Sequence, residues 1–179
     1  MIISEPLRGM GHIRTVIGNT VEDLTCALIP DSRRHKTDSR ADYCPDVSAN
    51  GRYYETKAVG RSREAFVYSG RLKKDRQFVD DGNQLDYVIW HHKVAVAGIQ
   101  TVEELSSAII GNIVSAYIIP FDDFWFLCQW LPVEKLNSKY GKHQTEPSTY
   151  GTGYRINLTW LDNYRLADGA LMRFMATRI

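Results

Sequence analysis

Residues 42–59 read DYCPDVSANGRYYETKAV, and a strong turn signal stands in the middle of this stretch. Asn50 and Gly51 both tolerate the positive backbone φ angles that a tight two-residue hairpin turn requires. The flanking segments include tyrosine, valine and threonine, which favour strands. We therefore predict a β-hairpin with its strands over 42–48 and 52–59.

The register of this hairpin brings two acidic residues together. With Asn50 and Gly51 as the loop residues, the numbers of every cross-strand pair sum to 101, so Asp46 faces Glu55. Directly opposite side chains have Cβ atoms about 4.5–5.5 Å apart, and two like charges there destabilise the pair. A divalent cation removes this repulsion, and hard carboxylate oxygens suit Mg²⁺. A bulge at Pro45 would shift the register, because proline cannot donate to the ladder.

Lys57 adds a positive charge beside the two carboxylates. Side chains alternate between the faces of a strand, so Lys57 projects on the same side as Tyr53 and Glu55. An ammonium group there can orient or help to deprotonate a metal-bound water, or stabilise charge on a phosphate. Hydrolysis of a phosphodiester bond needs these parts. The alternative is a surface hairpin whose carboxylates pair with Lys57 and nearby arginines.

The rest of the chain predicts helices alternating with strands. Apolar residues recur at spacings of three and four through 12–29, which is typical of an amphipathic helix, and Pro30 ends it. Thr101 and Glu104 stand at the spacing of a capping box. This order predicts an α/β fold, a central mixed β-sheet flanked by helices, in one domain over 1–179. The other helices and strands are expected at 71–81, 87–90, 101–110, 113–119 and 154–160, with a surface loop at 136–153.

Composition narrows the class of protein. The 179 residues are 44% hydrophobic and 24% charged, as in ordinary globular domains. Apolar runs stay well short of the roughly 20 residues of a membrane helix, and the N-terminus does not resemble a signal peptide. We expect an intracellular, cytoplasmic protein with no membrane partner. An odd number of widely spaced cysteines does not suit a disulfide framework, so reduced and buried thiols are expected.

Charge is unevenly distributed, although the formal net charge is only +1. Residues 31–76 hold 12 Lys and Arg against 7 Asp and Glu. Basic residues flank the hairpin on both sides, and on one face they would hold the phosphates of a DNA duplex. The alternative is a solvated surface loop. The candidate DNA contacts are Arg33, Arg34, Lys36, Arg40, Arg61 and Arg63.

The hairpin residues resemble a known nuclease signature. Pro45-Asp46, a turn and then Glu55-Thr56-Lys57 are similar to the motif of the PD-(D/E)XK nuclease superfamily. The stretch also resembles the phage-encoded junction-resolving endonucleases, and the resemblance covers roughly residues 14–92. It implies a restriction-endonuclease-like fold and a Mg²⁺-dependent endonuclease acting on DNA, with Mn²⁺ as a substitute. Many such enzymes are homodimers, because cutting both strands requires two sites.

The resemblance also implies roles for individual residues. Asp46 and Glu55 would bind Mg²⁺ together with the backbone carbonyl of Thr56, and Lys57 would serve the attacking water. Glu22, on the first predicted helix, would be a further metal ligand or would orient a second metal.

A short pattern on the first predicted helix supports the role of Glu22. Gly18-Asn19-Thr20-Val21-Glu22 fits the Gly-x-x-x-Glu that precedes the nuclease motif in archaeal Holliday junction resolvases. The alternatives are a solvated helix residue, or Asp23 in its place if the helix is rotated.

The leading hypothesis is an endonuclease selective for branched DNA, resembling the Holliday junction resolvases of DNA recombination. A sequence-specific type II restriction-like endonuclease would share the same hairpin. A non-catalytic DNA-binding module would keep it as a vestigial metal site. Aromatic residues near 121–130 either pack a core or form a dimer interface; they are Phe121, Phe124, Trp125, Phe126 and Trp130.

Overall fold

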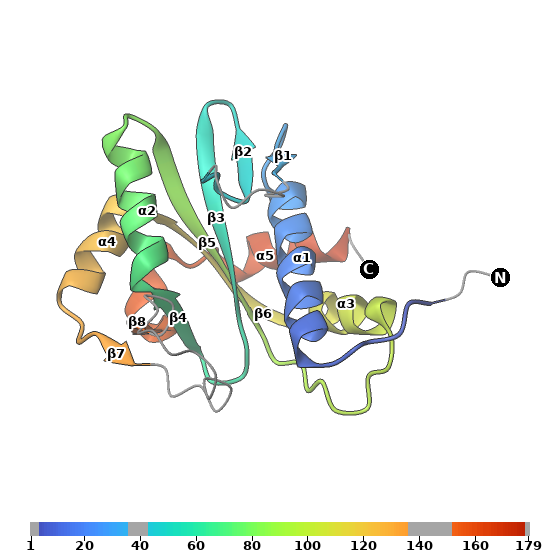
Figure 1. The fold of residues 1–179 in the computed structure, drawn as a ribbon. Coiled ribbons are helices and arrows are strands. Elements are labelled where there is room, and N and C mark those ends of the chain that lie inside the picture. Colours follow the sequence, from blue (N-terminus) through green and yellow to red (C-terminus); the bar gives the residue numbers. More distant parts are fainter. Residues whose placement is uncertain (1–3, 36–42, 136–151, 178–179) are drawn as a thin grey trace.

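A computed structural model describes residues 4–35, 43–135 and 152–177. Five strands form the central sheet in the order β1-β2-β3-β5-β6 (Figure 1). Strands β3 and β5 run parallel, and the other neighbours run antiparallel, so the predicted mixed sheet is confirmed. The bounds of the strands are β1 Arg33–Arg34, β2 Val47–Ala49, β3 Arg52–Val59, β5 Gln84–His92 and β6 Ile113–Pro120.

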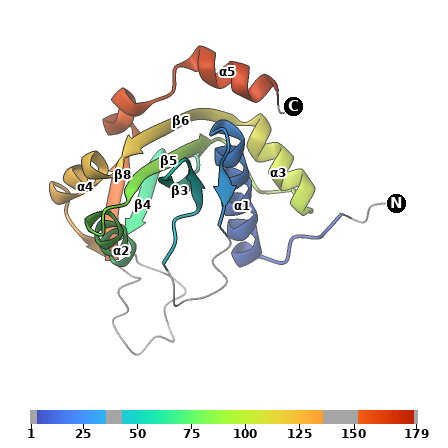
Figure 2. The same ribbon diagram turned by 90° about the horizontal axis from the view of Figure 1, so that it is seen from above.

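Helices flank the sheet, as the view from above in Figure 2 shows. One core contains Val88 and Trp90 of β5 and receives three helices: α1 Met10–Leu28, α3 Val102–Gly111 and α5 Asp168–Ala176. The opposite core contains Tyr87 and Ile89 of the same strand. It is covered by two helices and by a second sheet of order β4-β8-β7. Their bounds are α2 Ser69–Asp80, α4 Phe121–Gln129, β4 Glu64–Tyr68, β7 Glu134–Lys135 and β8 Thr152–Asn157.

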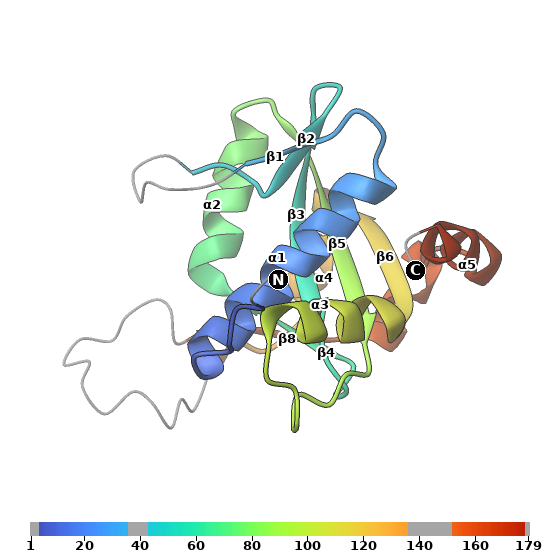
Figure 3. The same cartoon turned by 90° about the vertical axis from the view of Figure 1, so that its right-hand side faces the viewer.

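The two helices with the clearest sequence signals form as predicted, and Figure 3 shows them across one face of the sheet. The apolar stripe of 12–29 forms α1, which ends as Ile29 turns extended ahead of Pro30. The capping box of α3 is complete. Thr101 Oγ1 accepts the N–H of Glu104 at 3.2 Å, and the Glu104 carboxylate accepts the N–H of Thr101.

The hairpin turn also forms as predicted, but its first strand is shorter. Asn50 and Gly51 have φ angles of 50° and 79°, and Val47 pairs with Tyr54 in the predicted register. The strand expected over 42–48 is wrong within the described residues, because β2 begins only at Val47. A proline two positions earlier offers no N–H to extend the ladder.

Other elements differ from the expectation. Residues 33–34 form β1 and pair with β2, where no strand was predicted. The strand expected over 154–160 ends at Asn157, whose side chain accepts the N–H of Thr159 at 3.0 Å and starts a 3₁₀ helix, η2 Leu158–Tyr164. Asparagine competes for backbone donors in this way, which favours a cap over a continued strand.

Helix α4 was not predicted, although its buried residues Phe121, Phe124 and Cys128 follow a helical spacing. Phe121 and Phe124 are buried, whereas Phe126 and Trp130 are 64% and 75% exposed. The aromatic stretch therefore serves the core only in part. The loop predicted at 136–153 falls almost wholly outside the described residues.

No helix among the described residues has the length and apolar character needed to cross a membrane. The cysteines are free thiols, of which Cys128 is buried and Cys26 and Cys44 are half-buried. The expectation of buried thiols thus holds fully for Cys128 alone.

Candidate active site

Glu55 lies at the centre of a charged cluster on β3. Its side chain is only 2% exposed and shares the face of Lys57 and Tyr53, as predicted. The two carboxylate oxygens each receive a cation. Oε1 accepts from Lys57 Nζ, and Oε2 accepts from the guanidinium of Arg71 on α2. A carboxylate can be buried at this depth only when paired and hydrogen-bonded in such a way.

Asp46 reaches the same cluster by a different route from the one predicted. The β2–β3 ladder stops at Val47 and Tyr54, so the expected cross-strand pair of Asp46 with Glu55 does not form. The Asp46 backbone carbonyl instead accepts the N–H of His35 at 2.8 Å. Its side-chain Oδ2 accepts the N–H of Thr56 at 2.8 Å, which fixes the carboxylate against β3.

Electrostatics shows that these groups interact although they are not a ladder pair. Burial raises the pKa of Asp46 to about 7, and the charge of Glu55 adds to the increase. For Lys57, burial lowers the pKa, but the charges of Glu55 and Asp46 outweigh it and raise the pKa above its ordinary value. Mutual shifts of this kind concentrate at functional sites, and structural ion-pair networks also produce them.

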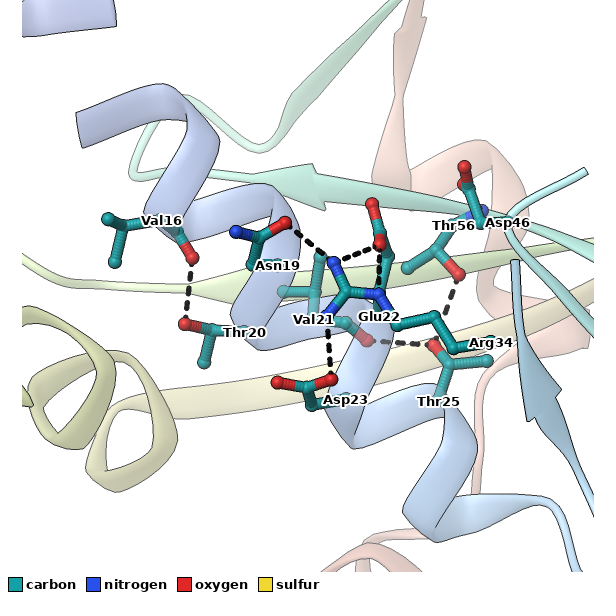
Figure 4. A network of polar contacts seen from close by, with 10 residues as sticks. All are labelled: Val16, Asn19, Thr20, Val21, Glu22, Asp23, Thr25, Arg34, Asp46 and Thr56. Atoms are coloured by element: carbon teal, nitrogen blue, oxygen red, sulfur yellow. Dashed lines mark hydrogen bonds and ion pairs between the residues drawn. The ribbon is translucent and has the colours of Figure 1, made fainter. Parts of the chain in front are cut away.

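Glu22 of α1 faces the sheet, whereas its rival Asp23 is 68% exposed. Figure 4 shows the Arg34 guanidinium between Asn19, Glu22 and Asp23. Its Nε lies 2.7 Å from Glu22 Oε2. Burial raises the pKa of Glu22, Arg34 counteracts this, and the charge of Glu55 raises it further. Glu22 therefore lies within electrostatic range of the cluster, with its carboxylate held by Arg34.

Arg71 and Asp75 of α2 belong to the site, although the sequence predicted neither as a partner of the acidic residues. Asp75 is fully buried and accepts from the hydroxyls of Tyr43 and Tyr87. Arg71 Nε lies 3.2 Å from Asp75 Oδ1, and the guanidinium stacks over the Tyr43 ring at 4.4 Å. The available signal was the i, i+4 spacing of Arg71 and Asp75, which places both on one side of a helix.

The arrangement offers oxygen donors suited to Mg²⁺. Within the described ranges, no three His, Cys, Asp or Glu side chains are gathered as a metal cluster. A backbone oxygen supplements the carboxylates, because the N–H and C=O of one strand residue point to the same side. The N–H of Thr56 points to Asp46, so its carbonyl faces that edge too. Asp46, Glu55 and this carbonyl supply oxygen atoms of the hard type that Mg²⁺ prefers.

The predicted DNA contacts divide into distinct groups. Arg33, Arg61 and Arg63 are exposed, and Arg61 Nε donates to the Lys93 carbonyl at 3.2 Å. Arg34 is half-buried and engaged with the acids of α1. The other two candidates, Lys36 and Arg40, lie outside the described residues.

Comparisons of the chain with protein-family models, with curated proteins and with solved structures found no match. The chemistry of the site therefore rests on the residues and their geometry.

Proposed function

We propose that this protein is a Mg²⁺-dependent DNA endonuclease with a restriction-endonuclease-like fold, selective for branched DNA. The observation that carries the proposal is the meeting of Asp46, Glu55 and Lys57 at the middle strand β3, just past the point where its pairing with β2 ends. Asp46 is anchored to the backbone of Thr56, and Glu55 is in contact with Lys57. Two acids and a lysine in this arrangement match the needs of phosphodiester hydrolysis.

The metal ion would be held by Asp46, Glu55 and the carbonyl of Thr56, with Mn²⁺ as a substitute for Mg²⁺. When bound, it would supply Lewis-acid stabilisation of the phosphate and lower the pKa of a coordinated water. Glu55 would exchange part of its contact with Lys57 or Arg71 on metal binding. Glu22 would join the ligand set only after release from Arg34.

The chain's own residues have separable tasks in this scheme. Lys57, 27% exposed, would hold its ammonium beside the attacking water and favour loss of a proton from it. Arg71 would place a second positive charge near the scissile phosphate, where charge builds up in the transition state. The exposed Arg33 and Arg61 would hold neighbouring phosphates without reading bases. A homodimer would place two such sites on one DNA junction.

One observation favours a second candidate, a non-catalytic DNA-binding module with a vestigial metal site. Glu55 is satisfied by two protein cations, which is also what a purely structural ion-pair cluster would show. A restriction-like specificity is the rival within the enzyme class, because the same hairpin serves both.

The deciding experiment is nicking of a supercoiled plasmid with Mg²⁺ and with EDTA. The wild type should cut only with Mg²⁺, whereas Asp46→Ala and Glu55→Ala should bind DNA at least as tightly and not cut it. Glu103→Ala, which removes an exposed acid on α3, is the matched control. Metal-dependent cutting at a near wild-type rate in both variants would refute the site. Comparing a four-way junction with linear duplexes of many sequences separates junction selectivity from restriction-like specificity.

A further inference from the structure

A polar pocket lies apart from the carboxylate cluster. We call it the His91 pocket; its volume is about 200 Å³. Three of the lining side chains are cationic, and no acidic side chain lines it. The lining residues are Arg63, His91, Lys93, Val114, Ser115, Tyr117 and Arg165. Arg165 pairs with Asp168 at 2.7 Å, whereas Arg63 and Lys93 have no acidic partner among the described residues. An excess of cations around a recess predicts an anionic ligand.

His91 supplies an independent sign of a missing ligand. The residue is only 3% exposed, and its Nε2 has no hydrogen-bond partner among the described residues. Its Nδ1 is tied to the hydroxyl of Ser115 at 3.3 Å, and that hydroxyl donates to the Tyr117 hydroxyl at 3.3 Å. The ring is therefore oriented by this chain of contacts. A buried and unpaired ring nitrogen is costly, so it points to a partner that the protein itself does not provide.

The composition of the pocket selects the class of anion. We infer that the His91 pocket binds a phosphate group, carried either by a nucleic-acid strand or by a free phosphate compound. Guanidinium groups such as Arg63 and Arg165 match the paired oxygens of a phosphate, and Lys93 adds a point charge. The His91 ring and the two hydroxyls can satisfy the remaining oxygens. The inference does not depend on the proposed nuclease activity.

The pocket and the candidate active site lie at different levels of the same two strands. In the parallel β3–β5 register, Glu55 is level with Tyr87 and Val59 is level with His91. The two positions on β3 are four residues apart, or roughly 13 Å along the strand. Alternation places Glu55, Val59 and His91 toward the same face of the sheet. Helices α2 and α4 and the second sheet cover this face, so the His91 pocket is a site separate from the carboxylate cluster.

Binding measurements in EDTA test the pocket without any cleavage. The probes are inorganic phosphate and a short DNA oligonucleotide with a 5′-phosphate or a 5′-hydroxyl. Arg63→Gln and Lys93→Gln each remove one exposed cation of the pocket, and Arg14→Gln removes an exposed cation of α1. We expect each pocket variant to weaken binding of a phosphate probe by roughly tenfold or more relative to Arg14→Gln, the scale of one charge-assisted hydrogen bond.

The probes identify the source of the phosphate. A loss confined to the 5′-phosphorylated oligonucleotide assigns the pocket to a strand end, and an equal loss for both oligonucleotides assigns it to the strand interior. A loss seen with inorganic phosphate assigns it to a free phosphate compound. The inference is overturned if no probe distinguishes the pocket variants from Arg14→Gln.

A titration of His91 by NMR provides a second readout. Burial lowers the pKa of His91, and the positive charges of Arg63, Lys93, His92 and Arg165 lower it further. A phosphate dianion in the pocket favours the protonated ring, so the pKa of His91 should rise on saturation. An unchanged pKa at saturating phosphate would place the anion elsewhere and overturn the inference.

Discussion

At the scale of single residues, the site depends on how two carboxylates are neutralised. Glu55 is almost completely buried and has two cations in contact. Among the described residues, the Asp46 carboxylate accepts one backbone N–H and has a more distant cation, so it bears the larger electrostatic penalty. A raised pKa is the signature of that penalty, since burial and a like charge both disfavour the ionised form.

The first prediction concerns the pH dependence of stability in Asp46→Asn. With its pKa raised to about 7, Asp46 makes the metal-free fold less stable as pH rises from about 4 through 7. Asparagine keeps the acceptor for the Thr56 N–H and loses the titration. The difference in unfolding free energy between the variant and wild type should therefore be roughly 2–3 kcal/mol larger, in favour of the variant, at pH 8 than at pH 5. Urea unfolding in EDTA measures this, and an equal gain at both pH values would contradict it.

The second prediction concerns Lys57→Ala. Loss of one positioned electrostatic or proton-transfer group should slow cleavage by about 10²- to 10³-fold. Magnesium affinity should not weaken, because Lys57 is not a ligand and its ammonium occupies an oxygen of Glu55. Single-turnover cleavage and calorimetric Mg²⁺ titration measure the two effects separately. Normal turnover with weakened metal binding would rule out this role for Lys57.

At the scale of elements, the short strand β1 gives two adjacent arginines different tasks. Strand alternation turns Arg34 toward α1, where it joins Glu22 and Asp23, and leaves Arg33 exposed. This contact clamps β1 against the first helix. The pair of neighbours therefore provides a matched comparison within a single strand.

The third prediction compares Arg34→Ala with Arg33→Ala. Arg34→Ala leaves the half-buried Glu22 carboxylate without this cation and should lower the unfolding free energy by about 1–2 kcal/mol. Arg33→Ala should change stability by no more than about 0.5 kcal/mol. If Arg33 contacts a phosphate, its loss should make the slope of log DNA affinity against log salt shallower by about 0.9. Chemical unfolding and salt-dependent binding separate the two, and a wild-type slope would remove Arg33 from the DNA surface.

At the scale of the whole molecule, Asp75 connects parts of the chain that are distant in sequence. Its carboxylate receives the hydroxyls of Tyr43 and Tyr87, so it joins α2 to the segment before β2 and to β5. The Tyr87 ring stacks on Phe124 of α4 with centroids 4.2 Å apart. One buried carboxylate thus links the charged cluster to the core on that side of the sheet.

The fourth prediction compares Asp75→Asn with Asp80→Asn on the same helix. Asp75→Asn replaces one carboxylate oxygen with an NH₂ group, which faces a tyrosine hydroxyl that itself donates. The unfolding free energy should therefore fall by roughly 3 kcal/mol. Asp80 is 54% exposed and pairs with Arg76, so its substitution should cost less than about 1 kcal/mol. Urea unfolding curves of both variants provide the measurement. Equal effects would show that the Asp75 network is not a stabilising centre.

The elements with local signals were determined by the sequence itself. The Asn50-Gly51 turn, the alternation that sets Glu55 beside Lys57, and the capping box at Thr101 all depend on neighbours a few residues apart. Short-range sterics and hydrogen bonding suffice to specify such features.

The partners of the candidate site were decided only by the tertiary structure. The meeting of Arg71 with Glu55, of Arg34 with Glu22, and of Asp46 with the Thr56 N–H depends on packing between elements. No local pattern ranks one arginine above another, because each choice depends on which long-range arrangement best neutralises a buried carboxylate. Which cation pairs with each carboxylate depends on proximity in the folded chain and on the cost of leaving a buried charge unpaired.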